Sequence, residues 1–140
     1  MSAAQADCVF CKIVSGAIPC HRLLDNASVL AFLDINPLTD GHSVVIPKAH
    51  AERLDQLAPE QAAEIGRVLG DLARRIVASV GAEGYNILQN NGPVAGQVVP
   101  HVHFHIIPRR AGDGLGYRWN AKPAQHEKLA ALVARVTATT

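Results

Sequence analysis

The sequence predicts one α+β domain built on an antiparallel sheet. A chain of 140 residues is long enough for one hydrophobic core and too short for two ordinary domains. Its composition, 49% hydrophobic and 18% charged, is that of a globular protein. Most strand-like runs are joined by connections too short for parallel crossovers, and only two long segments show helical periodicity. We therefore expect about five strands and two main helices in a single domain over residues 1–140.

The first half of the chain indicates a short helix followed by three strands. Residues 10–15 favour the helix, which ends before the Gly16–Pro19 break. Runs at 21–24 and 29–34 flank the turn signal Asp25-Asn26 and predict a hairpin. A third strand is expected at 43–46, between Gly41 and Pro47.

The second half contains both main helices. Apolar residues recur with helical spacing from Pro59 to Val80, with Gly81 just beyond the end. Residues 85–89 and 102–107 have strand character, and a turn-rich stretch over 90–96 joins them. A last amphipathic helix closes the chain through Leu129, Leu132, Val133 and Val136.

Charge and cysteine content limit the partners and the compartment. Thirteen Lys and Arg residues against twelve Asp and Glu residues give a net charge of +1, which predicts neither a nucleic-acid nor a membrane partner. The first residues lack a charged leader followed by an apolar run, and no window approaches eighteen apolar residues. With an odd cysteine count of three, this indicates a cytoplasmic protein with reduced thiols.

Three alternating histidines are the clearest signal for chemistry. On a strand His101, His103 and His105 would share one face, while the residues between them point into a core. Aligned neutral imidazoles suit nucleophilic catalysis, in which the central His103 attacks and its neighbours orient it or bind the developing anion. Two alternatives stay open at this point, namely a polar sheet face and a zinc hydrolase that uses two of the histidines.

Two further segments indicate a nucleotide. Gly96 and Gly92 bracket a loop whose amides can approach a phosphate, with Asn90 and Gln97 as side-chain donors, although an ordinary hairpin loop looks the same. Asp34 can accept both ribose hydroxyls, or it can simply cap the turn before Pro37. The apolar residues that could enclose a base are Phe10, Ile13, Ile18, Phe32 and Ile35.

These blocks together resemble the histidine triad (HIT) family, in its bacterial nucleotide-binding branch, over residues 8 to about 110. The blocks are Cys8-Val-Phe-Cys11-Lys, Ile18-Pro19, Ala31-Phe-Leu-Asp34-Ile, Gly41-His-Ser-Val-Val-Ile-Pro-Lys48-x-His50, Asn90-Asn-Gly, Gly96-Gln97 and His101-Val-His-Phe-His105. The resemblance implies a HIT-like fold whose sheet continues across a homodimer. It also implies hydrolysis at the α-phosphorus of purine nucleoside phosphoramidates or related conjugates, through a covalent nucleotidyl-histidine that releases a nucleoside monophosphate.

The resemblance also assigns roles to residues. His103 becomes nucleotidylated, His105 contacts the phosphate and assists, Asp34 binds the ribose, and Asn90, Gly96 and Gln97 line the phosphate. Val98 stands where eukaryotic relatives carry a serine near the leaving group, so the proton source for the leaving amine is an open question. A nucleotide-binding adaptor with incidental hydrolysis and a dinucleoside polyphosphate hydrolase are the alternative functions.

The remaining candidates are a metal site and the C-terminal segment. Cys8-x-x-Cys11 is compatible with redox chemistry, or with a closed structural zinc site completed by His50 and His101. Bacterial relatives with these four residues bind zinc, so the resemblance implies structural zinc and no organic cofactor. Residues 109–123 are expected to form a lid or dimer contact around Tyr117 and Trp119. The residues left as structural or surface positions are His21, His42, His126 and Cys20.

Overall fold

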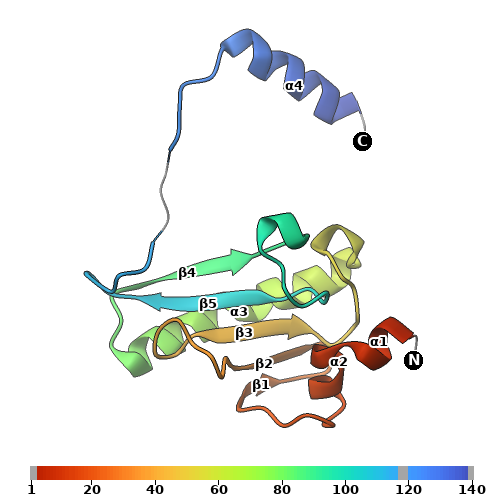
Figure 1. The fold of residues 1–140 in the computed structure, drawn as a ribbon, viewed down its shortest axis with the longest axis vertical. Coiled ribbons are helices and arrows are strands. Elements are labelled where there is room, and N and C mark those ends of the chain that lie inside the picture. The colour runs from red at the N-terminus through yellow and green to blue at the C-terminus, as the bar shows by residue number, and fades with distance from the viewer. Residues whose placement is uncertain (1–2, 117–119, 139–140) are drawn as a thin grey trace.

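A computed structural model describes residues 3–116 and 120–138. Its centre is a five-stranded antiparallel sheet in the order β1-β2-β3-β5-β4 (Figure 1). The strands are β1 (Arg22–Asp25), β2 (Val29–Leu33), β3 (Ser43–Pro47), β4 (Gly84–Gln89) and β5 (Phe104–Arg109). The helices are α1 (Ala3–Asp7), α2 (Val9–Val14), α3 (Pro59–Val80) and α4 (His126–Ala138), with short 3-10 turns at Leu54–Gln56 and Pro93–Ala95. The predicted α+β class with an antiparallel sheet is confirmed.

Helix α3 covers one face of the sheet and lies behind it in Figure 1. It begins with Pro59 in the first turn and ends at Gly81, whose φ of 68° is left-handed. Its buried residues, Ile65, Leu72, Ala73 and Ile76, pack against β2, β3 and β5. Gly41 allows the chain to pass close to this helix, because a Cβ there would lie 3.0 Å from Ile76 and its φ is 87°.

The opposite face carries α2, which covers β2 and β3. Phe10, Cys11 and Ile13 turn inward from α2. They join a cluster with residues from the sheet, comprising Cys8, Phe10, Cys11, Ile13, Leu30, Phe32, Val44 and Ile46. The two faces of the sheet therefore have separate apolar clusters, one beneath α3 and one beneath α2.

The last strand begins later than predicted. We expected a strand over 102–107, but β5 starts at Phe104, so His101 and His103 precede it. The reason is the backbone pairing: His101 N–H donates to the Val99 carbonyl, and Val102 N–H donates to the Ala51 carbonyl. Pairing with β3 starts only where Phe104 faces Val45. The histidines therefore lie partly on an irregular approach to the strand, which lets them point to different partners.

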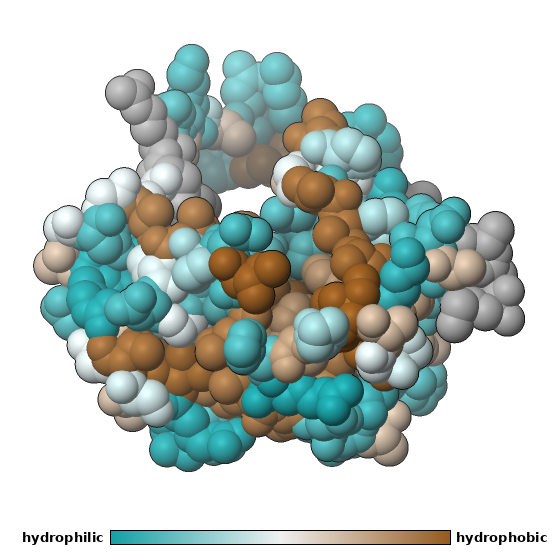
Figure 2. Space-filling model, turned by 60° about the horizontal axis from the view of Figure 1, so that its bottom comes forward, coloured by the Kyte–Doolittle hydropathy of each residue, from teal (hydrophilic) through white to brown (hydrophobic). Residues whose placement is uncertain are grey.

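The C-terminal helix forms as predicted but stands away from the body, and a gap separates the two in Figures 1 and 2. Its four apolar residues are 45–61% exposed. The segment after Arg109, which we call the arm, leads to this helix. An ion pair of 2.8 Å between Arg109 and Asp113 holds its first residues in place. Tyr117 and Trp119, the centre of the predicted lid or dimer contact, lie outside the described residues. Across the part of the chain that is described, no helix has both the length and the apolar character to cross a membrane.

Candidate active site and metal centre

His103 sits at the centre of the candidate active site and is only 6% exposed. Its Nδ1 lies 2.7 Å from the carbonyl oxygen of His101. A carbonyl only accepts, so Nδ1 carries the proton in this hydrogen bond, and in the neutral ring Nε2 holds the lone pair. The local backbone thus fixes the tautomer that a nucleophilic histidine needs.

His105 belongs to a second hydrogen-bond chain, which includes a residue that the sequence reasoning missed. His42 is 4% exposed, and its Nδ1 accepts from the backbone N–H of Leu38 at 3.0 Å. Its Nε2 therefore carries the proton and donates it to Nδ1 of His105, 2.9 Å away. Nε2 of His105 is left as an N–H donor. Strand alternation puts residues 42 and 44 on one face, but only the pairing of Val44 with His105 in the sheet brings His42 to the histidine triad.

Burial keeps this chain neutral. It lowers the pKa of His105 to about 4, with His103 and His42 adding repulsion and Asp34 partly opposing the shift. Burial also lowers the pKa of His42, against the opposing charge of Asp34. Both rings are neutral near pH 7, so the hydrogen-bond directions above are those of the resting site. Taken together, the site presents one nitrogen lone pair on His103 and one N–H donor on His105, with ring centroids 5.0 Å apart.

Asp34 shows features of both of its predicted roles. Its Oδ1 accepts from Asn36 N–H at 2.8 Å, which is the turn-capping arrangement. Its Oδ2 lies 3.7 Å from Nε2 of His42, beside the histidine chain, and the side chain is 23% exposed. One carboxylate oxygen therefore remains available to a ligand.

The apolar candidates for a base pocket come together only in part. Phe10, Ile13 and Phe32 share one buried cluster, and Ile18 packs at its edge. The Phe10 ring contacts His103 edge-to-face, with centroids 5.1 Å apart. Ile35 lies outside this cluster and is 78% exposed.

The predicted phosphate loop is held by its own polar side chains. Gly96 has a φ of 94°, and a Cβ there would lie 3.4 Å from the Asn90 amide. Gln97 accepts from Gly92 N–H at 2.7 Å through Oε1 and donates from Nε2 to the Glu52 carbonyl at 2.6 Å. The Gln97 amide is thus occupied in shaping the loop, and the backbone N–H groups of Ala95, Gly96 and Gln97 donate to carbonyls of the same loop. Val98 is 89% exposed.

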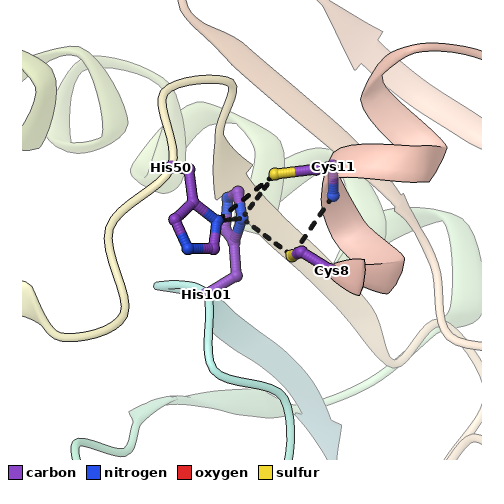
Figure 3. Close-up of side chains that lie close together, drawn as sticks. All are labelled: Cys8, Cys11, His50 and His101. Atoms are coloured by element: carbon purple, nitrogen blue, oxygen red, sulfur yellow. Dashed lines mark hydrogen bonds between the residues drawn. The ribbon is translucent and has the colours of Figure 1, made fainter. Parts of the chain in front are cut away.

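Four side chains predicted as metal ligands do meet at one point (Figure 3). Cys11 comes from α2 and Cys8 from the N-cap position just before it, His50 from the segment after β3, and His101 from the approach to β5. Nδ1 of His101 lies 3.4 Å from Cys8 Sγ, 3.6 Å from Cys11 Sγ and 3.2 Å from Nδ1 of His50. Nδ1 of His50 lies 3.3 Å from Cys11 Sγ. Sequence spacing was uninformative here, and the fold brings the set together.

The donor geometry fits a tetrahedral metal ion. Zinc bonds of about 2.0–2.1 Å to nitrogen and about 2.3 Å to sulfur place neighbouring ligand atoms roughly 3.3–3.8 Å apart. Nε2 of His101 lies 2.8 Å from the Pro47 carbonyl, so it carries the proton and Nδ1 turns its lone pair to the cluster. In the absence of a cation, burial beside Cys8 raises the pKa of Cys11 to about 11, and such a thiol needs a cation to ionise at neutral pH.

A second cluster of possible ligands, Asp34, His42 and His105, does not fit a metal equally well. The Leu38 N–H occupies Nδ1 of His42, so the proton of that ring is on Nε2, the atom that would have to bind the ion. This cluster is built as a hydrogen-bond chain. The two clusters thus divide into a candidate metal centre and a candidate proton relay.

The fold and the site together define an α+β protein in which an antiparallel sheet places two neighbouring histidines of opposite tautomer beside an apolar cluster. The HIT domain family model matches residues 15–112, and the chain belongs to the HIT family. It is 48% identical to the adenosine 5'-monophosphoramidase of Schizosaccharomyces pombe over 126 residues, 89% of this chain and 92% of that protein.

Solved structures are similar over almost the whole chain. A HIT family protein from Bacillus anthracis is 39% identical with a TM-score of 0.91, covering 96% of this chain and 97% of the other. A zinc-bound histidine triad family protein from Mycobacterium smegmatis is 38% identical with a TM-score of 0.75, covering 97% and 99%.

Proposed function

We propose that the protein hydrolyses purine nucleoside phosphoramidates, or related nucleotide conjugates, through a covalent nucleotidyl-His103 intermediate. The observation that carries this proposal is the pairing of a lone pair on His103 Nε2 with an N–H donor on His105 Nε2. This arrangement suits attack on a phosphorus atom whose oxygens gain negative charge. The similarity to an adenosine 5'-monophosphoramidase supports the substrate class.

The reaction runs in two displacements. Nε2 of His103 forms a bond to the α-phosphorus as the phosphorus–nitrogen bond of the substrate breaks, and the leaving amine takes up a proton. Water then attacks the phosphorus, the bond to His103 breaks, and the nucleoside monophosphate leaves with the ring regenerated. The His105 N–H and the loop of Asn90, Gly96 and Gln97 hold the phosphate oxygens. Val98 supplies no proton, and its 89% exposure leaves solvent water as the proton source for the amine.

The nucleoside half is bound by the other predicted residues. Oδ2 of Asp34 accepts from the ribose hydroxyls, while Oδ1 keeps the loop in place. Phe10, Ile13 and Phe32 form the apolar wall for the base, with Ile18 at its edge. Apolar side chains offer no hydrogen-bond partners to a base edge, so this wall should accept adenine and guanine alike.

The proposal includes a structural zinc ion on Cys8, Cys11, His50 and His101. Four protein ligands leave no position for water or substrate, so the metal supplies stability and no Lewis-acid step. The zinc-bound relative from M. smegmatis supports a metal in this fold. We also propose a homodimer, in which the arm after Arg109 reaches the second copy, and a cytoplasmic location.

The decisive test is rapid-quench turnover of adenosine 5'-phosphoramidate, followed by intact-protein mass spectrometry under neutral conditions. We expect a burst of ammonia and a transient adduct of one AMP per chain on wild-type protein. His103→Asn should bind AMP but lose the adduct and several orders of magnitude in turnover. His21→Asn, which changes an exposed histidine away from the site, is the matched control. An active His103→Asn protein would refute the mechanism, whereas AMP binding without any turnover would favour the adaptor function.

A further inference from the structure

We infer that zinc and the nucleotide base bind cooperatively, because the metal centre and the base pocket share the helix α2. This inference rests on the proposed function and adds a regulatory property to it. The helix has only six residues, Val9–Val14, and Cys8 caps its start while Cys11 lies within it. Phe10, a wall of the base pocket, stands between the two thiols in the sequence.

The contacts of Phe10 connect both sites directly. Its ring lies edge-to-face against the proposed ligand His101, with centroids 5.8 Å apart, and against the proposed nucleophile His103 at 5.1 Å. It also contacts Phe32 on β2 at 5.8 Å. A shift of α2 therefore displaces one wall of the base pocket and leaves the opposite wall, which belongs to the sheet, in place.

The attachment of α2 to the rest of the fold depends on side chains. The backbone hydrogen bonds made by residues 8–18 have partners within residues 5–18 in the described part of the chain. What joins this segment to the sheet is the apolar cluster around Phe10 and the polar contacts of the two thiols with His50 and His101. A metal that bonds to both thiols and both histidines would fix α2 at two points, one on each side of Phe10.

Coupling of this kind is reciprocal. If zinc places Phe10 for the base, a bound base holds α2 and its thiols in the geometry that zinc requires. Coupling free energies between sites in proteins typically change affinity by about 5- to 150-fold, and we expect about tenfold here. The ribose contact proposed for Asp34 follows β2, and the phosphate contacts proposed for His105 and the 90–98 loop lie on β5 and on that loop, so none of them is carried by α2.

The experiment measures AMP binding by calorimetry to zinc-loaded protein and to protein stripped with a chelator, below the melting temperature of the stripped form. We expect AMP to bind about tenfold more weakly to the stripped protein, and zinc to bind tighter by the same factor in saturating AMP. Ribose 5-phosphate, which has no base, should bind equally to both forms. Equal binding of ribose 5-phosphate would show that removing zinc displaces the base wall and does not disrupt the whole binding site.

Two matched substitutions in the same cluster localise the effect. Phe10→Leu should weaken AMP binding and remove its dependence on zinc, whereas Phe32→Leu, on the sheet side of the pocket, should weaken binding and keep the dependence. Equal AMP affinity with and without zinc would overturn the coupling while leaving the proposed function intact. A zinc-loaded protein that fails to bind AMP would overturn the coupling and the proposed function together. An equal zinc effect on ribose 5-phosphate would overturn the route through Phe10.

Discussion

Acid should destabilise the fold through His105, and the size of this effect follows from the structure. Burial lowers the pKa of His105 to about 4, against an ordinary value of 6.5. The folded state therefore resists protonation more than the unfolded state does. The stabilising contribution is complete above pH 6.5 and is lost as the pH falls toward 4. At pH 5 the two pKa values correspond to a loss of about 2 kcal/mol from this one ring.

The assay is urea unfolding of zinc-stripped protein at pH 7 and pH 5, so that acid release of metal makes no contribution. The decrease in unfolding free energy between these pH values should be about 2 kcal/mol smaller in His105→Gln than in wild type. His21→Gln replaces an exposed histidine and should keep the wild-type decrease. Equal decreases in wild type and His105→Gln would show that His105 titrates normally and is not the neutral donor inferred here.

Four other outcomes test separate parts of the structure. Wild type should prefer AMP over 2'-deoxy-AMP by about 1–3 kcal/mol in calorimetry, because the deoxy ligand leaves a carboxylate oxygen unpaired, and Asp34→Ala should remove the preference. Cys8→Ala with Cys11→Ala should abolish zinc binding and lower the melting temperature, while the saturated single-turnover rate stays within severalfold of wild type; a hundredfold loss restored by zinc would indicate a metallohydrolase instead. Gly41→Ala should cost about 2–4 kcal/mol in urea unfolding, because a Cβ there meets Ile76 and the φ is 87°, whereas Gly70→Ala in α3 meets nothing within 4 Å and should stabilise. His42→Leu should slow turnover at least about tenfold without weakening AMP binding, since His105 loses the donor that sets its tautomer.

The sequence predicted the strands and helices whose pattern is local. The spacing of Ile65, Leu72 and Ile76 specifies the buried face of α3, and alternation specifies the strands, so both are readable without tertiary information. The boundary before β5 was predicted wrongly because the Ala51 carbonyl, far away in sequence, takes the Val102 N–H. Such a pairing depends on the fold and leaves no mark in composition or period.

Site residues, too, could be predicted where their signal is local in the sequence, but not where their role depends on tertiary contacts. The histidine alternation of residues 101–105 is local, and it predicted the candidate nucleophile. His42 was missed because its role depends on the pairing of β3 with β5, which brings it against a ring 63 residues away. Ile35 follows the end of β2 and is exposed, so its contact with the base stays a prediction.

Backbone partners explain how one residue type serves several functions within this small site. A carbonyl beside one ring nitrogen keeps the proton there and leaves the other nitrogen as a lone pair, which is the case for His103 and His101. An N–H beside the ring has the opposite effect and turns the far nitrogen into a donor, as Leu38 does for His42. The same imidazole thus offers a lone pair, as on His103 and His101, or an N–H donor, as on His105, according to the local backbone. Moving the backbone carbonyl or N–H that faces one ring nitrogen should therefore shift the proton to the other nitrogen. The ring would then change from lone-pair carrier to N–H donor, or the reverse, although the histidine itself is kept.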